Sequence, residues 1–178
     1  MLDTNILKGF DIFSDISSDK LTLIAKNCDS LEFKPNDVIF NQDEVAMNFY
    51  GVIDGEVELY IVHEDEIVTK EIQYEESIQT QHETVKKTIV IDSVGPGEVF
   101  GWSSFVVGGR LTATARCTTH SRLFNILADD LNTIFDKDTA LGYIFMRKIN
   151  EVIWHHFQKR TDKLIEAWVE AFDVKTII

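Results

Sequence analysis

The sequence predicts a mainly β fold with helices before and after the strands, and three observations carry this prediction. Short runs rich in β-branched and aromatic residues recur between residues 38 and 126, separated by glycine, proline and aspartate. One pair of runs is joined by Asp54-Gly55, a dipeptide that tolerates the positive φ of a two-residue hairpin turn. The longer helical patterns lie ahead of the first run and behind the last one.

A helical lead-in is predicted at the start of the chain. Residues 10–13 are followed by Ser17-Ser18-Asp19, which can cap a helix over the apolar run 21–25. Lys34-Pro35-Asn36-Asp37 then indicates a turn into a first strand at 38–40.

The central strands follow from runs of β-forming residues. Asn48 to Ile53 and Glu56 to Val62 flank the hairpin turn, and two further strands are expected at 113–117 and 121–126. Residues 128–135 then predict a short helix with acidic residues in its first turn, where they favour the positive end of the helix dipole.

A long closing helix is expected to start near Asp138 or Thr139. Its apolar residues continue with helical spacing on both sides of the polar stretch 158–163. A projecting helix with apolar residues needs a partner to bury them, so we expect a homodimer through this helix. The alternative is that the terminal segment folds back onto the rest of its own chain. The apolar positions are Phe145, Ile149, Val152, Ile153 and Phe157, then Leu164, Trp168, Ala171 and Phe172.

The most informative stretch reads Pro-Gly-Glu-Val-Phe-Gly-Trp-Ser-Ser-Phe over residues 96–105, with Gly-Gly-Arg-Leu-Thr-Ala-Thr-Ala over 108–115. It predicts a glycine turn, a single turn of helix and a strand. A helical turn opening at Gly101 to Ser104 would direct unpaired N–H groups at a small anion. Arg110 would place a cation nearby.

These residues resemble the phosphate-binding cassette of the cyclic-nucleotide-binding domain family, which has Phe-Gly-Glu-Leu-Ala-Leu followed by Arg-x-Ala-Thr. The resemblance spans about residues 8–157 and includes the strand Gly-Glu-Val-Glu-Leu. It implies a double-stranded β-helix (jelly roll) with N-terminal helices and a long C-terminal helix. Within this family, the chain resembles the sensor β-roll of catabolite-activator-type regulators, without the DNA-binding domain that follows it in those proteins.

The resemblance implies a single domain over residues 1–178. Its helical lead-in and β-roll occupy 8–137, and its C-terminal helical segment occupies 138–178. An insertion at about 63–90 departs from the family, which joins these two strands with a few residues. Residues 63–87 contain seven acidic residues against three lysines. We favour an extension of the roll's own strands meeting in a solvated loop, and the alternative is an acidic arm that meets a protein partner.

The cassette also departs from its family pattern. In an ungapped register, the glutamate that binds the ribose 2′-hydroxyl falls on Trp102, and the arginine that pairs with the cyclic phosphate falls on Leu111. We prefer this register because it also aligns Ala113-Thr114 with the Ala-Thr of the family. A one-residue deletion in the turn at 108–109 would instead restore Arg110 to the phosphate. Losing the hydroxyl interaction costs roughly 1.5–3 kcal/mol, and leaving a buried charge unpaired costs about 3–5 kcal/mol. A micromolar ligand would then bind at about millimolar or weaker.

Two functions remain open. The first is a small-ligand-sensing regulatory module with an atypical pocket, which binds cyclic AMP weakly or not at all and takes a cyclic nucleotide or another small anion. The second is a ligand-free dimeric interaction or scaffold module whose pocket is plugged by Trp102. The position of Trp102, inside the roll or beside a cavity, separates them. The candidate ligand-binding residues are Gly101, Trp102, Ser103, Ser104, Arg110, Leu111, Thr112 and Ala113.

Composition argues against several other classes. A net charge of −13 and the lack of residues for a second domain after the long helix argue against nucleic-acid binding. The chain has no apolar run of about 18 residues and no signal-peptide pattern, so we expect a cytoplasmic protein without membrane contact. Cys28 and Cys117 are expected to be buried reduced thiols. No His-x-His metal motif or Gly-x-Ser-x-Gly nucleophile motif occurs, and we expect neither a metal nor catalysis.

Overall fold

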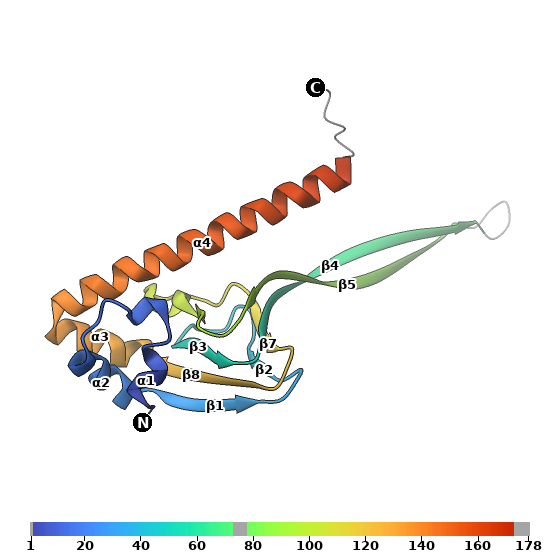
Figure 1. The fold of residues 1–178 in the computed structure, drawn as a ribbon. Coiled ribbons are helices and arrows are strands. Elements are labelled where there is room, and N and C mark those ends of the chain that lie inside the picture. Colours follow the sequence, from blue (N-terminus) through green and yellow to red (C-terminus); the bar gives the residue numbers. More distant parts are fainter. Residues whose placement is uncertain (1, 73–77, 173–178) are drawn as a thin grey trace, which may run out of the picture.

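A computed structural model describes the backbone of residues 2–72 and 78–172 (Figure 1). Over these residues the strands form two four-stranded antiparallel sheets, ordered β1-β8-β3-β6 and β2-β7-β4-β5. The mainly β fold with flanking helices is confirmed. The strands are β1 (Asp29–Phe33), β2 (Val38–Phe40), β3 (Asn48–Asp54), β4 (Val57–Ile72), β5 (Ile78–Val94), β6 (Val99–Phe100), β7 (Thr114–Cys117) and β8 (Ser121–Leu127).

The helices α1, α2 and α3 gather at one end of the roll, and α4 begins there and runs away from it (Figure 1). Ser17 precedes α2 in an extended conformation, as the capping pattern predicted, although its side chain makes no capping hydrogen bond. The predicted short helix and closing helix are present as α3 and α4. The helical elements are α1 (Thr4–Leu7), the 3-10 turn η1 (Asp11–Phe13), α2 (Ser18–Lys26), the 3-10 turn η2 (Trp102–Phe105), α3 (Ala128–Lys137) and α4 (Thr139–Phe172).

Two apolar clusters form the core. One lies between the helices and the first sheet, where Phe124 packs edge-on against Phe10 at 4.9 Å between ring centroids. The other fills the inside of the roll, where Tyr50 and Phe100 stack at 5.1 Å. Trp102 packs against both clusters. The residues of η2 therefore lie at the junction between the roll and the helices α1, η1, α2, α3 and the start of α4, which we call the helical cap.

The strands β4 and β5 form a hairpin that projects from the roll (Figure 1). The two strands pair from Val57, which lies opposite Val94, to Ile72, which lies opposite Ile78. The register shifts once, between Leu59 and Tyr60. The roll's own strands thus run long through most of the insertion predicted at about 63–90. Residues 73–77, where the expected solvated loop falls, lie outside the described residues.

The two halves of α4 have different surroundings. Leu141, Phe145 and Ile149 are buried against the helical cap. Lys163 also contacts the roll, since its Nζ lies 3.5 Å from the carbonyl oxygen of Ile91 on β5. Beyond Lys163 the helix presents exposed apolar side chains, so over its described length α4 folds back onto its own roll only in its first part. We call these residues the distal face: Leu164, Ile165, Trp168, Val169 and Phe172.

Gly51 on β3 tests the packing between β3 and the helical cap. A Cβ atom at this position would overlap the rings of Phe124 and Phe10. We expect Gly51→Ala to lower the free energy of unfolding by about 1–3 kcal/mol, because overpacking forces buried rings out of position. Gly95→Ala is the matched control, since its nearest neighbour would be a Glu98 oxygen at 3.8 Å. Denaturant unfolding of both variants measures the difference, and equal stabilities would contradict this account.

Candidate functional site

The cassette begins at a sharp turn that requires glycine. Gly101 follows β6 with a φ of +83°, and a Cβ atom there would lie 2.8 Å from the carbonyl oxygen of Asn48. This left-handed residue starts η2, which begins at Trp102 and ends at Phe105. The single helical turn predicted at residues 101–104 therefore exists as a 3-10 turn displaced by one residue.

Most of the predicted site residues line one small cavity. Its volume is about 30 Å³, which is room for roughly two water molecules. Six of the eight candidates are in its wall: Gly101, Trp102, Ser103, Leu111, Thr112 and Ala113. The other lining residues are Phe40, Leu59 and Arg160.

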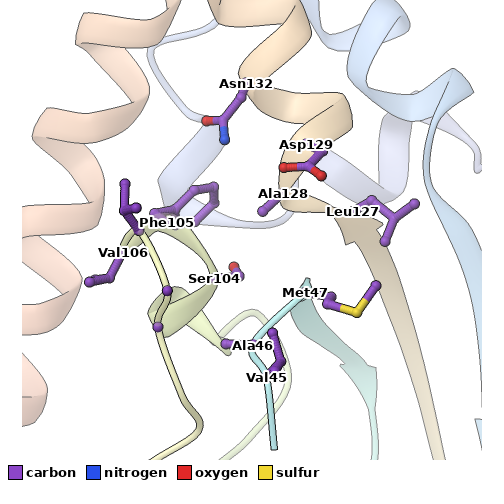
Figure 2. Close-up of a pocket in the computed structure, with 13 residues that line it drawn as sticks. Val45, Ala46, Met47, Ser104, Phe105, Val106, Leu127, Ala128, Asp129 and Asn132 are labelled. Atoms are coloured by element: carbon purple, nitrogen blue, oxygen red, sulfur yellow. The ribbon is translucent and has the colours of Figure 1, made fainter.

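The remaining two candidates lie elsewhere. Arg110 is exposed, its Nη1 donates to the carbonyl oxygen of Asp43 at 2.6 Å, and its backbone pairs with Val45. Ser104 lines a separate cavity of about 380 Å³ between η2 and the start of α3, where Figure 2 shows it among Met47, Ala128 and other residues. The wall of the small cavity thus contains Leu111 and not Arg110, as in the ungapped register.

Trp102 is partly buried between the roll and α4. Its indole faces the imidazole of His156, with 4.7 Å between ring centroids and 43° between the ring planes. Because this side chain also packs on both core clusters, it fills much of the space beside the cavity. The structure therefore places Trp102 next to a cavity that is present but very small.

A buried carboxylate on β5 attaches α4 to the roll beside this cavity. Asp92 has no exposed surface. His156 Nδ1 lies 2.6 Å from its Oδ2, and Lys159 Nζ lies 2.8 Å from its Oδ1. The amide of Ser93 also donates to Oδ1, at 2.9 Å. Arg160 Nε is farther away, 3.8 Å from Oδ2.

These contacts determine the ionisation of Asp92. Burial alone raises the pKa of its carboxyl, but the hydrogen bonds and charges of His156 and Lys159 lower that pKa by more. The net result is a pKa well below the ordinary range of aspartate. Asp92 is therefore ionised at neutral pH and acts as a fixed negative charge under α4.

Sequence reasoning did not select this cluster. Two signals were present in the sequence. Asp92 interrupts the apolar run 89–94, and the four residues His156, Lys159, Arg160 and Lys163 recur at spacings of three and four that place them on one helix face.

Other chemistry is not apparent in the described part of the chain. Among the side chains that the structure describes, those of residues 2–64 and 84–172, no group of three or more His, Cys, Asp or Glu could hold a metal ion. Cys28 and Cys117 are both buried free thiols, and burial raises the pKa of Cys28 to about 12. No helix in these residues is long and apolar enough to cross a membrane.

Comparison with known proteins points to one family. The family model described as "Cyclic nucleotide-binding domain" matches residues 30–138, more than half of the chain. No curated protein matches in sequence. A similar fold occurs in a cyclic nucleotide-binding domain from Methylobacillus flagellatus, with 15% identity, a TM-score of 0.66 and coverage of 92% of this chain and 81% of that one. Another occurs in the catabolite activator protein of Thermus thermophilus, with 17% identity, a TM-score of 0.60 and coverage of 89% of this chain and 63% of that one. A third is the regulatory domain of Toxoplasma gondii PKA crystallised with cAMP, with 11% identity, a TM-score of 0.59 and coverage of 83% of this chain and 47% of that one.

The attachment of α4 can be tested at Asp92. We expect Asp92→Asn to lower the free energy of unfolding by about 2–3 kcal/mol at neutral pH, because it leaves buried partners without their carboxylate. This value is below the usual range for buried pairs, since the side chains of Lys159 and Arg160 are 43% and 36% exposed and solvent screens them. Asp162→Asn, on an exposed position of the same helix, is the control and should change stability by less than about 0.5 kcal/mol.

The same variant gives a pH dependence. The pKa of Asp92 is lowered in the folded state, so its stabilisation is present above the unfolded pKa of about 3.9 and is lost as the pH falls below it. The difference between wild type and Asp92→Asn should therefore be larger at pH 5 than below about pH 4, where protonation of Asp92 removes it. Denaturant unfolding at several pH values measures it. A difference that grows as the pH falls would contradict the assigned pairing.

Proposed function

Because this chain belongs to the cyclic nucleotide-binding domain family, we propose that it is a small-ligand-sensing regulatory module with an atypical pocket. One observation carries this proposal. The cassette cavity has a volume of about 30 Å³, and its wall contains Trp102 and Leu111 where the family pattern has glutamate and arginine. Ordinary ligand pockets have volumes of about 300–1,000 Å³. Cyclic AMP binding is accordingly weak or lost, and the fitting ligand is a small anion.

The mechanism links the pocket to α4. In the hydrogen bonds of the described residues, the amides of Trp102 and Ser103 donate to no protein acceptor, so both can receive an anion. A ligand larger than the cavity has to move Trp102, whose indole lies on His156 of α4. Binding would therefore shift α4, provided that the ligand prefers one position of the helix over the other.

A second candidate function is a dimeric interaction module whose pocket stays plugged by Trp102. The distal face favours it, because five large apolar side chains are exposed together at the end of α4. On either proposal the protein is cytoplasmic, is not an enzyme and does not bind nucleic acid. A protein partner for the acidic hairpin β4–β5 belongs to the second proposal.

Cyclic AMP titration tests the atypical pocket. We expect a dissociation constant above about 10 μM, corresponding to a binding free energy weaker than about −7 kcal/mol. The double variant Trp102→Glu/Leu111→Arg restores both family side chains and should bind at least about a hundredfold more tightly, because each restored interaction contributes more than about 1.4 kcal/mol. Isothermal titration calorimetry measures both proteins. Wild-type binding below 10 μM would contradict the proposal.

The oligomeric state tests the distal face. We expect a homodimer through α4 and dissociation on Trp168→Asp, because a symmetric interface counts each buried carboxylate twice. Trp168 is 61% exposed in one subunit, so the substitution should leave the fold of the subunit intact. Glu166→Gln on the same turn is the control and should remain dimeric. Light scattering measures the mass, and a monomeric wild type at micromolar concentration would refute the dimer.

A further inference from the structure

We propose that Arg160 of α4 supplies the positive charge of the cassette pocket, so that the pocket accepts an oxyanion and its occupancy controls the attachment of α4 at Asp92. The inference rests on the proposed ligand-sensing function and adds the residue that selects the ligand. The oxyanion is either a free inorganic ion or the phosphoryl group of a larger molecule.

Position is the first argument. Among the residues lining the 30 Å³ cavity, Arg160 is the one with a charged side chain. Its Nε is buried and has no hydrogen-bond acceptor, although a buried N–H donor normally has one. The other polar side chains in the wall are the hydroxyls of Ser103 and Thr112, which can donate to an anion oxygen.

Charge balance is the second argument. The carboxylate of Asp92 already receives close contacts from His156, Lys159 and the Ser93 amide, all at 2.9 Å or less. Arg160, at 3.8 Å, is outside hydrogen-bonding distance. One carboxylate thus faces two permanent cations, Lys159 and Arg160. The cluster keeps a surplus positive charge, and the weakly held cation is the one that borders the cavity.

The arginine nearer in sequence is directed elsewhere. Arg110 is held to the Asp43 carbonyl, and Leu111 provides apolar wall where the family pattern has its phosphate-binding arginine. In this chain the cation therefore comes from α4 instead of the strand that follows the cassette. A guanidinium suits this task because its planar set of N–H donors matches the oxygens of phosphate.

Because Arg160 belongs to α4, binding of an oxyanion in the cavity competes with the attachment of α4 to Asp92. An oxyanion in the cavity draws the Arg160 guanidinium toward itself and away from Asp92. Arg160 follows Lys159 directly and lies one turn after His156, so movement of Arg160 pulls on the contacts that hold α4 to β5. A small ion fits the existing cavity, whereas a nucleotide phosphate also requires Trp102 to leave His156.

Inorganic phosphate and cyclic AMP, titrated separately into the full chain by calorimetry, test the assignment. We expect phosphate to bind the wild type and Arg160→Gln to weaken it roughly ten- to hundredfold, the loss typical of a charge-assisted hydrogen bond. Arg160→Lys should retain part of the affinity. Arg110→Gln is the matched control and should bind as the wild type does. Binding of phosphate without cyclic AMP would identify a free ion as the ligand, and tighter binding of cyclic AMP would identify a nucleotide phosphoryl group.

Hydrogen exchange of the α4 amides around residues 156–163 gives the second readout. Phosphate should change their exchange in the wild type and in Arg110→Gln but leave it unchanged in Arg160→Gln. If binding is lost in Arg110→Gln and kept in Arg160→Gln, the Arg160 assignment is overturned while ligand sensing stands. If the folded wild type binds neither ligand at millimolar concentration, the ligand-sensing function itself fails, and this inference with it.

Discussion

The arrangement of the site depends on the contacts between the buried carboxylate of Asp92 and the side chains of α4. A charge with no exposed surface is stable only where partners replace its hydration, and here those partners come mainly from α4. The helix is therefore fixed to β5 at one point by polar contacts, beyond the part buried by apolar packing. The same point brings His156 onto Trp102 and Arg160 to the cassette cavity. A single carboxylate thus determines how the closing helix meets the pocket.

The cassette cavity is small, and Trp102 forms part of its wall. Trp102 contacts the core of the roll, the core under the helices and a ring of α4, so moving it disturbs three packed regions. Close-packed interiors do not deform continuously, and a ligand that enlarges the cavity has to shift the helix as a unit. The family pattern uses a glutamate at this position. In this chain the residue at this position is a tryptophan that contacts α4 through His156.

The sequence predicted the features that depend on neighbouring residues. The start of α2 after Ser17 and the glycine turns at Gly55 and Gly101 follow from local conformational preferences. The hairpin predicted at Asp54-Gly55 is wrong, because β3 pairs with β6 and β8, whereas β4 pairs with β5 and β7 in the other sheet. The cluster at Asp92 could not be predicted in the same way, because its partners lie more than 60 residues away in the sequence. The ungapped register already favoured Leu111 over Arg110. The structure adds the contacts that hold Arg110 outside the cavity wall, a bridge to Val45 and a hydrogen bond to the Asp43 carbonyl.

The length of α4 joins the pocket to the distal face. Arg160 and Trp168 are eight residues apart, which is about 12 Å along an α-helix, and no helix end separates them. Between them, a groove of about 400 Å³ lies against the base of the hairpin, with Ile89 and Leu164 in its opposite walls. A rotation of α4 that frees Arg160 from Asp92 therefore also reorients the apolar residues that a second subunit would cover. The proposed ligand sensing and the proposed dimerisation would therefore use one continuous helix, and a change at the pocket would alter the geometry of the distal face.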